Sequence, residues 1–142
     1  SARGEAAADK KVEESYRERS PIFHLQRTGD LPLDIAAGVT DGHTGSVPIA
    51  HSLEAFNIVA RVHNATLVSN DEMTQLSTQM KLTSPTPDDQ VTDESYGRAI
   101  LLRRNAGASR VTIFDGGHEG LPGAGASWLA NQKRATQAPA AP

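Results

Sequence analysis

Two short apolar runs that end in glycine-containing loops constrain the fold of this chain most strongly. Residues 33–39 read Leu-Asp-Ile-Ala-Ala-Gly-Val and lead to Asp41, and residues 110–114 read Arg-Val-Thr-Ile-Phe and lead through two glycines to His118. Short apolar runs bounded by turn residues predict buried strands. Helical patterns separate the two runs, and strands that alternate with helices favour a parallel pair. The sequence therefore predicts an α/β fold with Asp41 and His118 at one edge of a sheet.

The segment between these loops predicts two helices and one strand of a hairpin. Residues 48–62 begin with proline and carry apolar side chains at the spacing of one helix face. Ser69 and Glu72 have the spacing of a capping box, which begins a second helix. Residues 99–103 form a β-like run, and the glycine-containing connection at 104–109 predicts a hairpin with the run that precedes His118.

The two ends of the chain differ in composition from its middle. Residues 1–20 carry five basic and five acidic side chains and predict a charged helix or linker. Residues 135–142 are rich in alanine and proline and predict a disordered tail. Residues 21–134 form the predicted domain, which closes with a short helix at 123–132. Residues 83–97 hold four acids and predict a solvated loop, because they lack the glycine-centred spacing of a calcium site.

Charge and composition exclude several partners and sites. A net charge of −3 gives no global attraction for nucleic acid or anionic membrane, and no apolar run is long enough to span a bilayer. The absence of cysteine excludes disulfides, thiolate metal sites and a cysteine nucleophile. The histidines lack the ligand spacing of a helical metal pair, so we expect no metal. The compartment stays open, and one expectation is a soluble chain that is secreted or periplasmic after processing.

Four arginines lie on or beside the predicted hairpin. We expect them to cover it and to pair with the acidic loop, and an anion site is the alternative. They are Arg98, Arg103, Arg104 and Arg110.

Residues 33–53 resemble the acid-bearing region of α/β-hydrolases, within which they are most similar to the prolyl-oligopeptidase-like branch of S9-type peptidases and esterases. Members of that branch follow the penultimate core strand with Gly-x-x-Asp and then with a Val-Pro that begins a helix. The matching residues are Gly38, Asp41, Val47 and Pro48. Residues 111–119 resemble the last core strand with its catalytic histidine, and residues 16–22 resemble the segment before the acid strand.

The resemblance implies the C-terminal half of an α/β-hydrolase fold, with parallel core strands, a hairpin strand and flanking helices. It implies a serine hydrolase that cleaves a small-molecule ester or a peptide, in which Asp41 orients His118 and His118 acts as general base and then as general acid. Acyl transfer of this kind uses no metal and no organic cofactor. His43 would line the substrate cleft beside Asp41, and a structural or solvent-facing role is the alternative for His43 and His51.

The chain departs from the family in one decisive respect, because it contains no Gly-x-Ser-x-Gly. The nucleophile precedes the acid in the chain order of this fold, so we expect the serine and the oxyanion hole to lie upstream of Ser1, in an N-terminal hydrolase half. Ser46 lies near Asp41 in sequence but has no nucleophile elbow. The 77 positions from Asp41 to His118 are also more than is usual for the family.

A non-catalytic half-domain that acts as a binding or assembly module is the alternative function. A parallel sheet cut midway exposes an edge strand, which invites pairing with a partner or with a second copy. An upstream Gly-x-Ser-x-Gly in the gene would favour the enzyme, and its absence would favour the assembly module.

Overall fold

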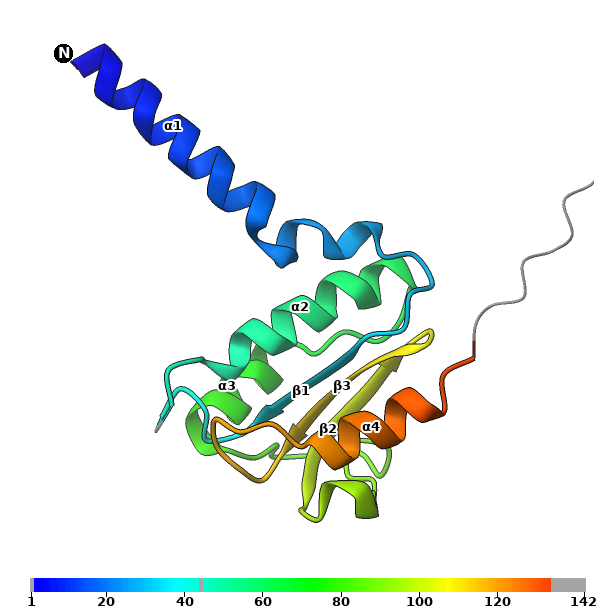
Figure 1. Ribbon diagram of the computed structural model, residues 1–142. Helices are drawn as coiled ribbons and strands as arrows, with labels where there is room; N and C mark the ends of the chain where they lie inside the picture. Colours follow the sequence, from blue (N-terminus) through cyan, green and yellow to red (C-terminus); the bar gives the residue numbers. More distant parts are fainter. Residues whose placement is uncertain (1, 44, 134–142) are drawn as a thin grey trace, which may run out of the picture.

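The computed structural model describes residues 2–43 and 45–133 and contains a small α/β fold (Figure 1). In chain order, α1 (Ala2–Arg19) and two 3-10 turns (Pro21–Phe23 and Leu25–Arg27) precede β1 (Asp34–Gly38), α2 (Ile49–Val62) and α3 (Asn70–Gln79). A third 3-10 turn (Glu94–Tyr96) then precedes β2 (Ile100–Ala106), β3 (Ser109–Phe114) and α4 (Pro122–Ala130). The predicted tail at 135–142 lies outside the described residues.

The sheet has three strands in the order β1-β3-β2. β1 runs parallel to β3, and β2 runs antiparallel to β3, so the predicted crossover and the predicted hairpin are both confirmed. The hairpin connection is shorter than the predicted 104–109. Residues 104–106 pair with residues 109–111 of β3, so the turn consists of residues 107 and 108 alone. Gly107 adopts a φ of 59° in this turn, a conformation that favours glycine.

The apolar side of α2 forms the main core with one face of the sheet. Its side chains Leu53, Phe56 and Ala60 are fully buried, as the helical spacing predicts. The same cluster contains Leu102, Val111 and Ile113 from the sheet and Leu76 from α3. The helix α3 begins with the predicted capping box, in which Ser69 and Glu72 bond to each other's backbone.

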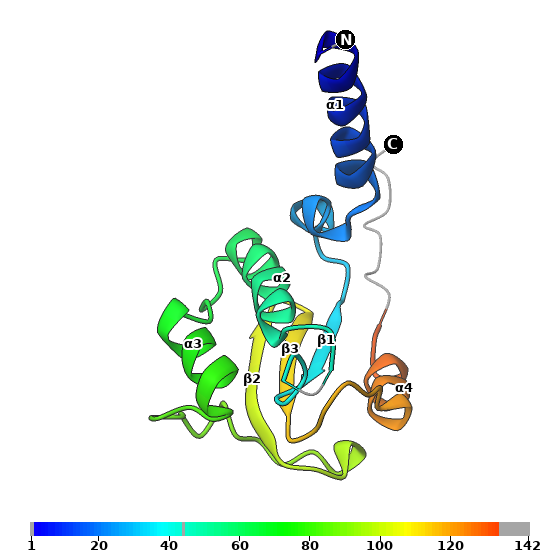
Figure 2. The same cartoon turned by 90° about the vertical axis from the view of Figure 1, so that its left-hand side faces the viewer.

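The other face of the sheet carries a smaller core beneath α4. Tyr96 and Phe114 meet edge to face with ring centroids 6.0 Å apart, and Ile100 and Ala124 complete the cluster. In Figure 2 the strands lie between α2 and α3 on one side and α4 on the other. The central strand β3 is therefore buried on both faces, and this packing fixes the position at which the loop to His118 begins.

The acidic loop at 83–97 contains a buried carboxylate, so the predicted solvated face is wrong at Asp89. Asp89 is 3% exposed and pairs with Arg104 at 3.1 Å. The hydroxyl and backbone N–H of Thr86 donate to its other oxygen, each at 2.9 Å. Arg104 also pairs with Glu72 of α3. The guanidinium therefore joins the hairpin to α3 and to the acidic loop.

The other three arginines also have acidic partners. Arg103 pairs with Asp93 in the acidic loop at 2.9 Å, as predicted. Arg110 pairs with Asp34 of β1 at 2.7 Å and also with Asp93 of the acidic loop, at 4.0 Å. Arg98 differs from the prediction, because it pairs with Glu119 after β3.

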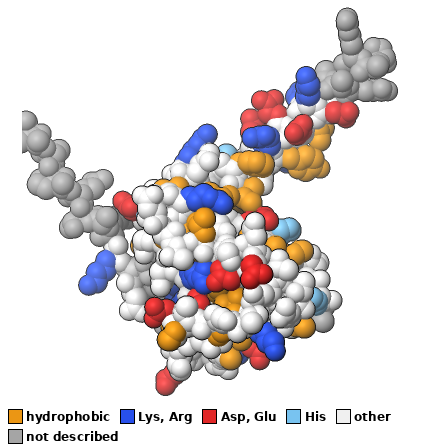
Figure 3. Space-filling view, turned by 180° about the vertical axis from the view of Figure 1, so that it is seen from behind, with side chains coloured by type: hydrophobic (Ala, Val, Ile, Leu, Met, Phe, Trp, Pro, Cys, Tyr) orange, Lys and Arg blue, Asp and Glu red, His pale blue; other side chains and the backbone are white. Residues whose placement is uncertain are grey.

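The helix α1 projects away from the sheet and its covering helices in both ribbon views (Figures 1 and 2). Apolar side chains are visible along it in Figure 3, and Val12 and Tyr16 are both exposed. No helix within the described ranges is long and apolar enough to cross a membrane.

Candidate active site

The loops that follow β1 and β3 bring Asp41 and His118 into contact. The Nδ1–H of His118 donates to Oδ2 of Asp41 at 2.8 Å. Because β1 and β3 are parallel neighbours, their carboxyl ends lie at the same edge of the sheet. Residues 77 positions apart in the sequence therefore meet, because each follows one of two adjacent parallel strands.

Gly38 at the end of β1 allows the His118 loop to cross close to the strand. A Cβ added to Gly38 would lie 2.3 Å from the carbonyl oxygen of Gly117, a distance that no side chain could occupy. Thr40 fixes the crossing, because its N–H and its hydroxyl both donate to the carbonyl of Gly116, at 2.9 and 2.8 Å. Gly38 is thus required by the close approach of the two backbones.

The carboxylate of Asp41 is held in a nearly closed setting. Asp41 is 8% exposed, and its Oδ1 accepts the backbone N–H of Gly42 at 2.9 Å and that of Val47 at 3.3 Å. The hydrogen bond from His118 lowers the pKa of Asp41 most, burial opposes it, and the two backbone N–H groups lower it further. The carboxylate is therefore charged at neutral pH and ready to orient the imidazole.

Gly45 packs directly against this pair. A Cβ added at Gly45 would lie 2.3 Å from Oδ1 of Asp41 and 2.7 Å from Cβ of His118. Gly45 therefore lies close against the carboxylate. Asp41 is nearly buried, whereas the imidazole of His118 stays exposed.

The imidazole of His118 faces an open cleft of about 350 Å³. The side chain is 59% exposed, and its Nε2 makes no hydrogen bond to any residue that the structure describes. Ala36 and Ala37 of β1 line the cleft together with Ser52 of α2. An imidazole held at Nδ1 by a carboxylate, with Nε2 directed to an open space, can accept a proton from a group in that space.

His43 lies beside Asp41 in sequence but does not line the cleft. Its Nε2 contacts the backbone carbonyl of Ser77 at 2.6 Å, so the ring joins the loop after β1 to α3. His51 is exposed on α2, and Ser46 is exposed in the loop before it. These positions agree with the structural or solvent-facing alternative for both histidines.

Sequence reasoning missed four residues around the pair. Ser52 stands inside a helical pattern with no motif, and nothing in the spacing distinguishes Gly45 from the other glycines. Only its place next to His118 in the sequence could have identified Glu119. Its partner Arg98 was expected to pair with the acidic loop instead. The structure brings Ser52, Gly45 and Glu119 to the cleft or to the pair itself.

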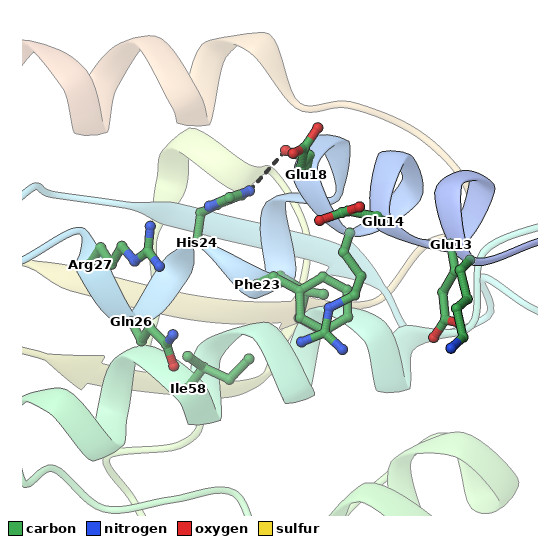
Figure 4. Close-up of a pocket in the computed structure, with 11 residues that line it drawn as sticks. Glu13, Glu14, Glu18, Phe23, His24, Gln26, Arg27 and Ile58 are labelled. Atoms are coloured by element: carbon green, nitrogen blue, oxygen red, sulfur yellow. Dashed lines mark hydrogen bonds between the residues drawn. The ribbon is translucent and has the colours of Figure 1, made fainter. Parts of the chain in front are cut away.

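A larger hollow of about 920 Å³ lies where α1 meets the 3-10 turns (Figure 4). The guanidinium of Arg17 lies 4.6 Å from the ring centroid of Phe23 there, and charged side chains of both signs surround them. The one histidine in this hollow, His24, bonds through Nε2 to the carbonyl of Glu18 at 2.9 Å, as the dashed line shows. The hollow has no carboxylate–imidazole contact, so it offers no acid–base pair like that of the cleft.

The described residues contain no group of three histidine, aspartate or glutamate side chains that could hold a metal ion. Comparisons with protein-family models, with curated proteins and with solved structures find no match to the chain. Asp41, His118 and the cleft are therefore the features from which a function can be inferred.

Proposed function

We propose that this chain supplies the acid and the base of a serine hydrolase that cleaves carboxylic esters or peptide bonds. The observation that carries the proposal is the 2.8 Å contact between Oδ2 of Asp41 and Nδ1 of His118, whose side chain lines an open cleft. In a Ser-His-Asp triad the carboxylate selects the tautomer with the proton on Nδ1 and stabilises the imidazolium that forms. The resemblance of both loops to those of the S9-type branch supports the same assignment.

The mechanism follows from this geometry. Nε2 of His118 takes the proton of a serine hydroxyl while the serine oxygen bonds to the substrate carbonyl carbon. The imidazolium, stabilised by Asp41, then gives that proton to the leaving alcohol or amine as the scissile bond breaks. In the second half Nε2 takes a proton from water, which attacks the acyl-enzyme, and returns it to the serine oxygen.

The serine is proposed to come from polypeptide outside residues 1–142. The chain holds no Gly-x-Ser-x-Gly, and within the described ranges β1 pairs with a strand on one side only, since the order is β1-β3-β2. The cleft beside His118 lies along β1 and is lined by its residues. A parallel strand added to the open edge of β1 would end near the cleft and could present a serine there.

The open edge of β1 also supports a second function, a binding or assembly module. An apolar groove of about 620 Å³ runs beside this edge, where Leu33 and Ile35 face Ala55 of α2. An unpaired strand with apolar neighbours favours addition of a strand from a partner or from a second copy. The two functions use the same surface and differ in whether Asp41 and His118 perform chemistry.

Co-expression with an upstream partner separates them. The gene is read upstream for Gly-x-Ser-x-Gly, the encoded polypeptide is co-expressed with this chain, and turnover of an activated ester and of short peptides is measured. We expect activity that falls by about 10⁴ in Asp41→Asn and at least as far in His118→Ala, because both remove the oriented base. The control Arg61→Gln, which changes an exposed residue of α2 away from the apolar groove, should keep full activity. A stable complex without turnover would favour the assembly module.

A further inference from the structure

We infer that the ion pair between Arg98 and Glu119 is a positioning clamp for His118. Nη2 of Arg98 donates to Oε2 of Glu119 at 2.8 Å, and Nη1 donates to Oε1 in a second, parallel contact. A pair with two parallel hydrogen bonds fixes the relative orientation of its groups, which a single charge contact does not. Glu119 follows His118 directly in the chain, so fixing Glu119 restricts the backbone that carries the imidazole.

The clamp is attached to the loop on both sides of His118. Oε1 of Glu119 accepts the backbone N–H of Gly117 at 3.2 Å, and the N–H of Glu119 donates to the carbonyl of Gly117 at 2.9 Å. Arg98 reaches back to the end of β3, where Nη1 donates to the carbonyl of Asp115 at 3.5 Å. The residues before and after His118 are therefore tied to one guanidinium, which stands just before β2.

The pair rests directly on the loop backbone. A Cβ added to Gly116 would lie 2.7 Å from Nη1 of Arg98 and 2.7 Å from Oε1 of Glu119. The guanidinium carbon of Arg98 also lies 5.9 Å from the ring centroid of Phe114, which is the last residue of β3. The hydrogen bonds from the N–H of Gly117 and from Arg98 lower the pKa of Glu119, so its carboxylate is charged at neutral pH.

His118 needs such support because packing does not hold its ring. Its side chain is 59% exposed, and its one described hydrogen bond is the contact with Asp41. The side chains of Arg98 and Glu119 are 36% and 38% exposed, and pairs this exposed contribute little to overall stability. Removal of the clamp should therefore loosen the loop while the fold persists, which makes its local role measurable.

The test uses imidazole NMR on the isolated chain and needs no partner. The Nδ1–H of His118, bonded to Asp41, should give a low-field proton signal, which His118→Ala assigns. We expect that signal to broaden in Arg98→Gln and in Glu119→Gln, and to broaden no further in the double variant, because either change alone already breaks the pair. The thermal midpoint of all these variants should stay within about 3 °C of the parent, as for a surface pair.

Arg61→Gln, which removes an exposed arginine from α2, is the matched control and should leave the signal unchanged. An unchanged signal in both Arg98→Gln and Glu119→Gln would overturn the clamp, and so would broadening in the double variant that equals the sum of the two single effects. These readouts concern the Asp41–His118 contact alone, so they stand or fall independently of the proposed hydrolase. In an active complex the same variants should lower kcat by about tenfold to a hundredfold with KM unchanged.

Discussion

Replacement of Arg104 by methionine tests the polar connection that holds the segment between Asp41 and His118. The guanidinium bonds to Asp89 at 3.1 Å, to the carbonyl of Leu67 at 2.8 Å and to both oxygens of Glu72. The side chain of Arg104 is 13% exposed and that of Asp89 is 4% exposed. Methionine keeps most of the apolar stem and leaves two carboxylates without their cation.

The expected loss is large because one of those carboxylates is buried. Removing one partner of a buried ion pair costs about 3–5 kcal/mol, since the other charge stays in a poorly solvated place. That is a substantial part of the free energy of unfolding of a typical domain, which is about 5–15 kcal/mol. With a urea m-value of about 2 kcal/mol/M, the unfolding midpoint should fall by about 2 M.

The same contact predicts how stability depends on pH. The hydrogen bond from Arg104 is the largest cause that lowers the pKa of Glu72 from 4.5 to about 2. A carboxylate whose pKa is lower in the folded state stabilises the fold above its unfolded pKa, and this stability is lost as the pH falls from about 5 to about 2. The full shift corresponds to about 3 kcal/mol, and solvent screening of the 25% exposed side chain reduces this to about 1–2 kcal/mol.

Urea unfolding of four proteins measures both effects. The parent, Arg104→Met, Glu72→Gln and the double variant are unfolded at pH 7 and at pH 3. We expect a coupling free energy of about 1–3 kcal/mol at pH 7 that shrinks at pH 3. A loss below about 1 kcal/mol in Arg104→Met, with no coupling to Glu72, would refute the reasoning.

Two further substitutions test the core and the crossing of the loops. Phe56→Ala removes a fully buried ring from α2 and should cost about 3–5 kcal/mol in denaturant unfolding, and a loss below about 1 kcal/mol would contradict the packing. Gly38→Ala places a Cβ 2.3 Å from the carbonyl of Gly117, so it should cost about 1–3 kcal/mol and shift the His118 imidazole signals, and an unshifted spectrum would contradict the close crossing.

Local patterns predicted the elements that depend on short-range spacing. The helix α2 follows from its apolar period, α3 from its capping box, and the hairpin from two β-like runs on either side of a glycine. The approach of Asp41 to His118 also followed from the sequence, because two parallel strands separated by helices place their loops at one edge. For the helices and the hairpin, the pattern and the structure depend on the same few neighbouring residues.

The burial of some polar side chains, and several of their partners, escaped prediction. The burial of Asp89 depends on Arg104, 15 positions away, and the pair of Arg98 with Glu119 spans 21 positions. Asn57 is a similar case, because it lies buried in α2 and exchanges two hydrogen bonds with the backbone of Val68, at 2.7 and 2.8 Å. A charged or amide side chain finds such partners only after the strands and helices are assembled, so its own sequence neighbourhood does not identify them.

Labelling with a serine-directed fluorophosphonate tests the central proposal most directly. Such reagents react with a serine only when a base such as His118 removes its proton. The account predicts no label on this chain alone, and one label per complex on a serine of the co-expressed partner, absent in His118→Ala and retained in Arg61→Gln. Stoichiometric labelling of this chain by itself, with Ser46 and Ser52 as the first positions to map by mass spectrometry, would contradict it, as would labelling of the partner that persists in His118→Ala.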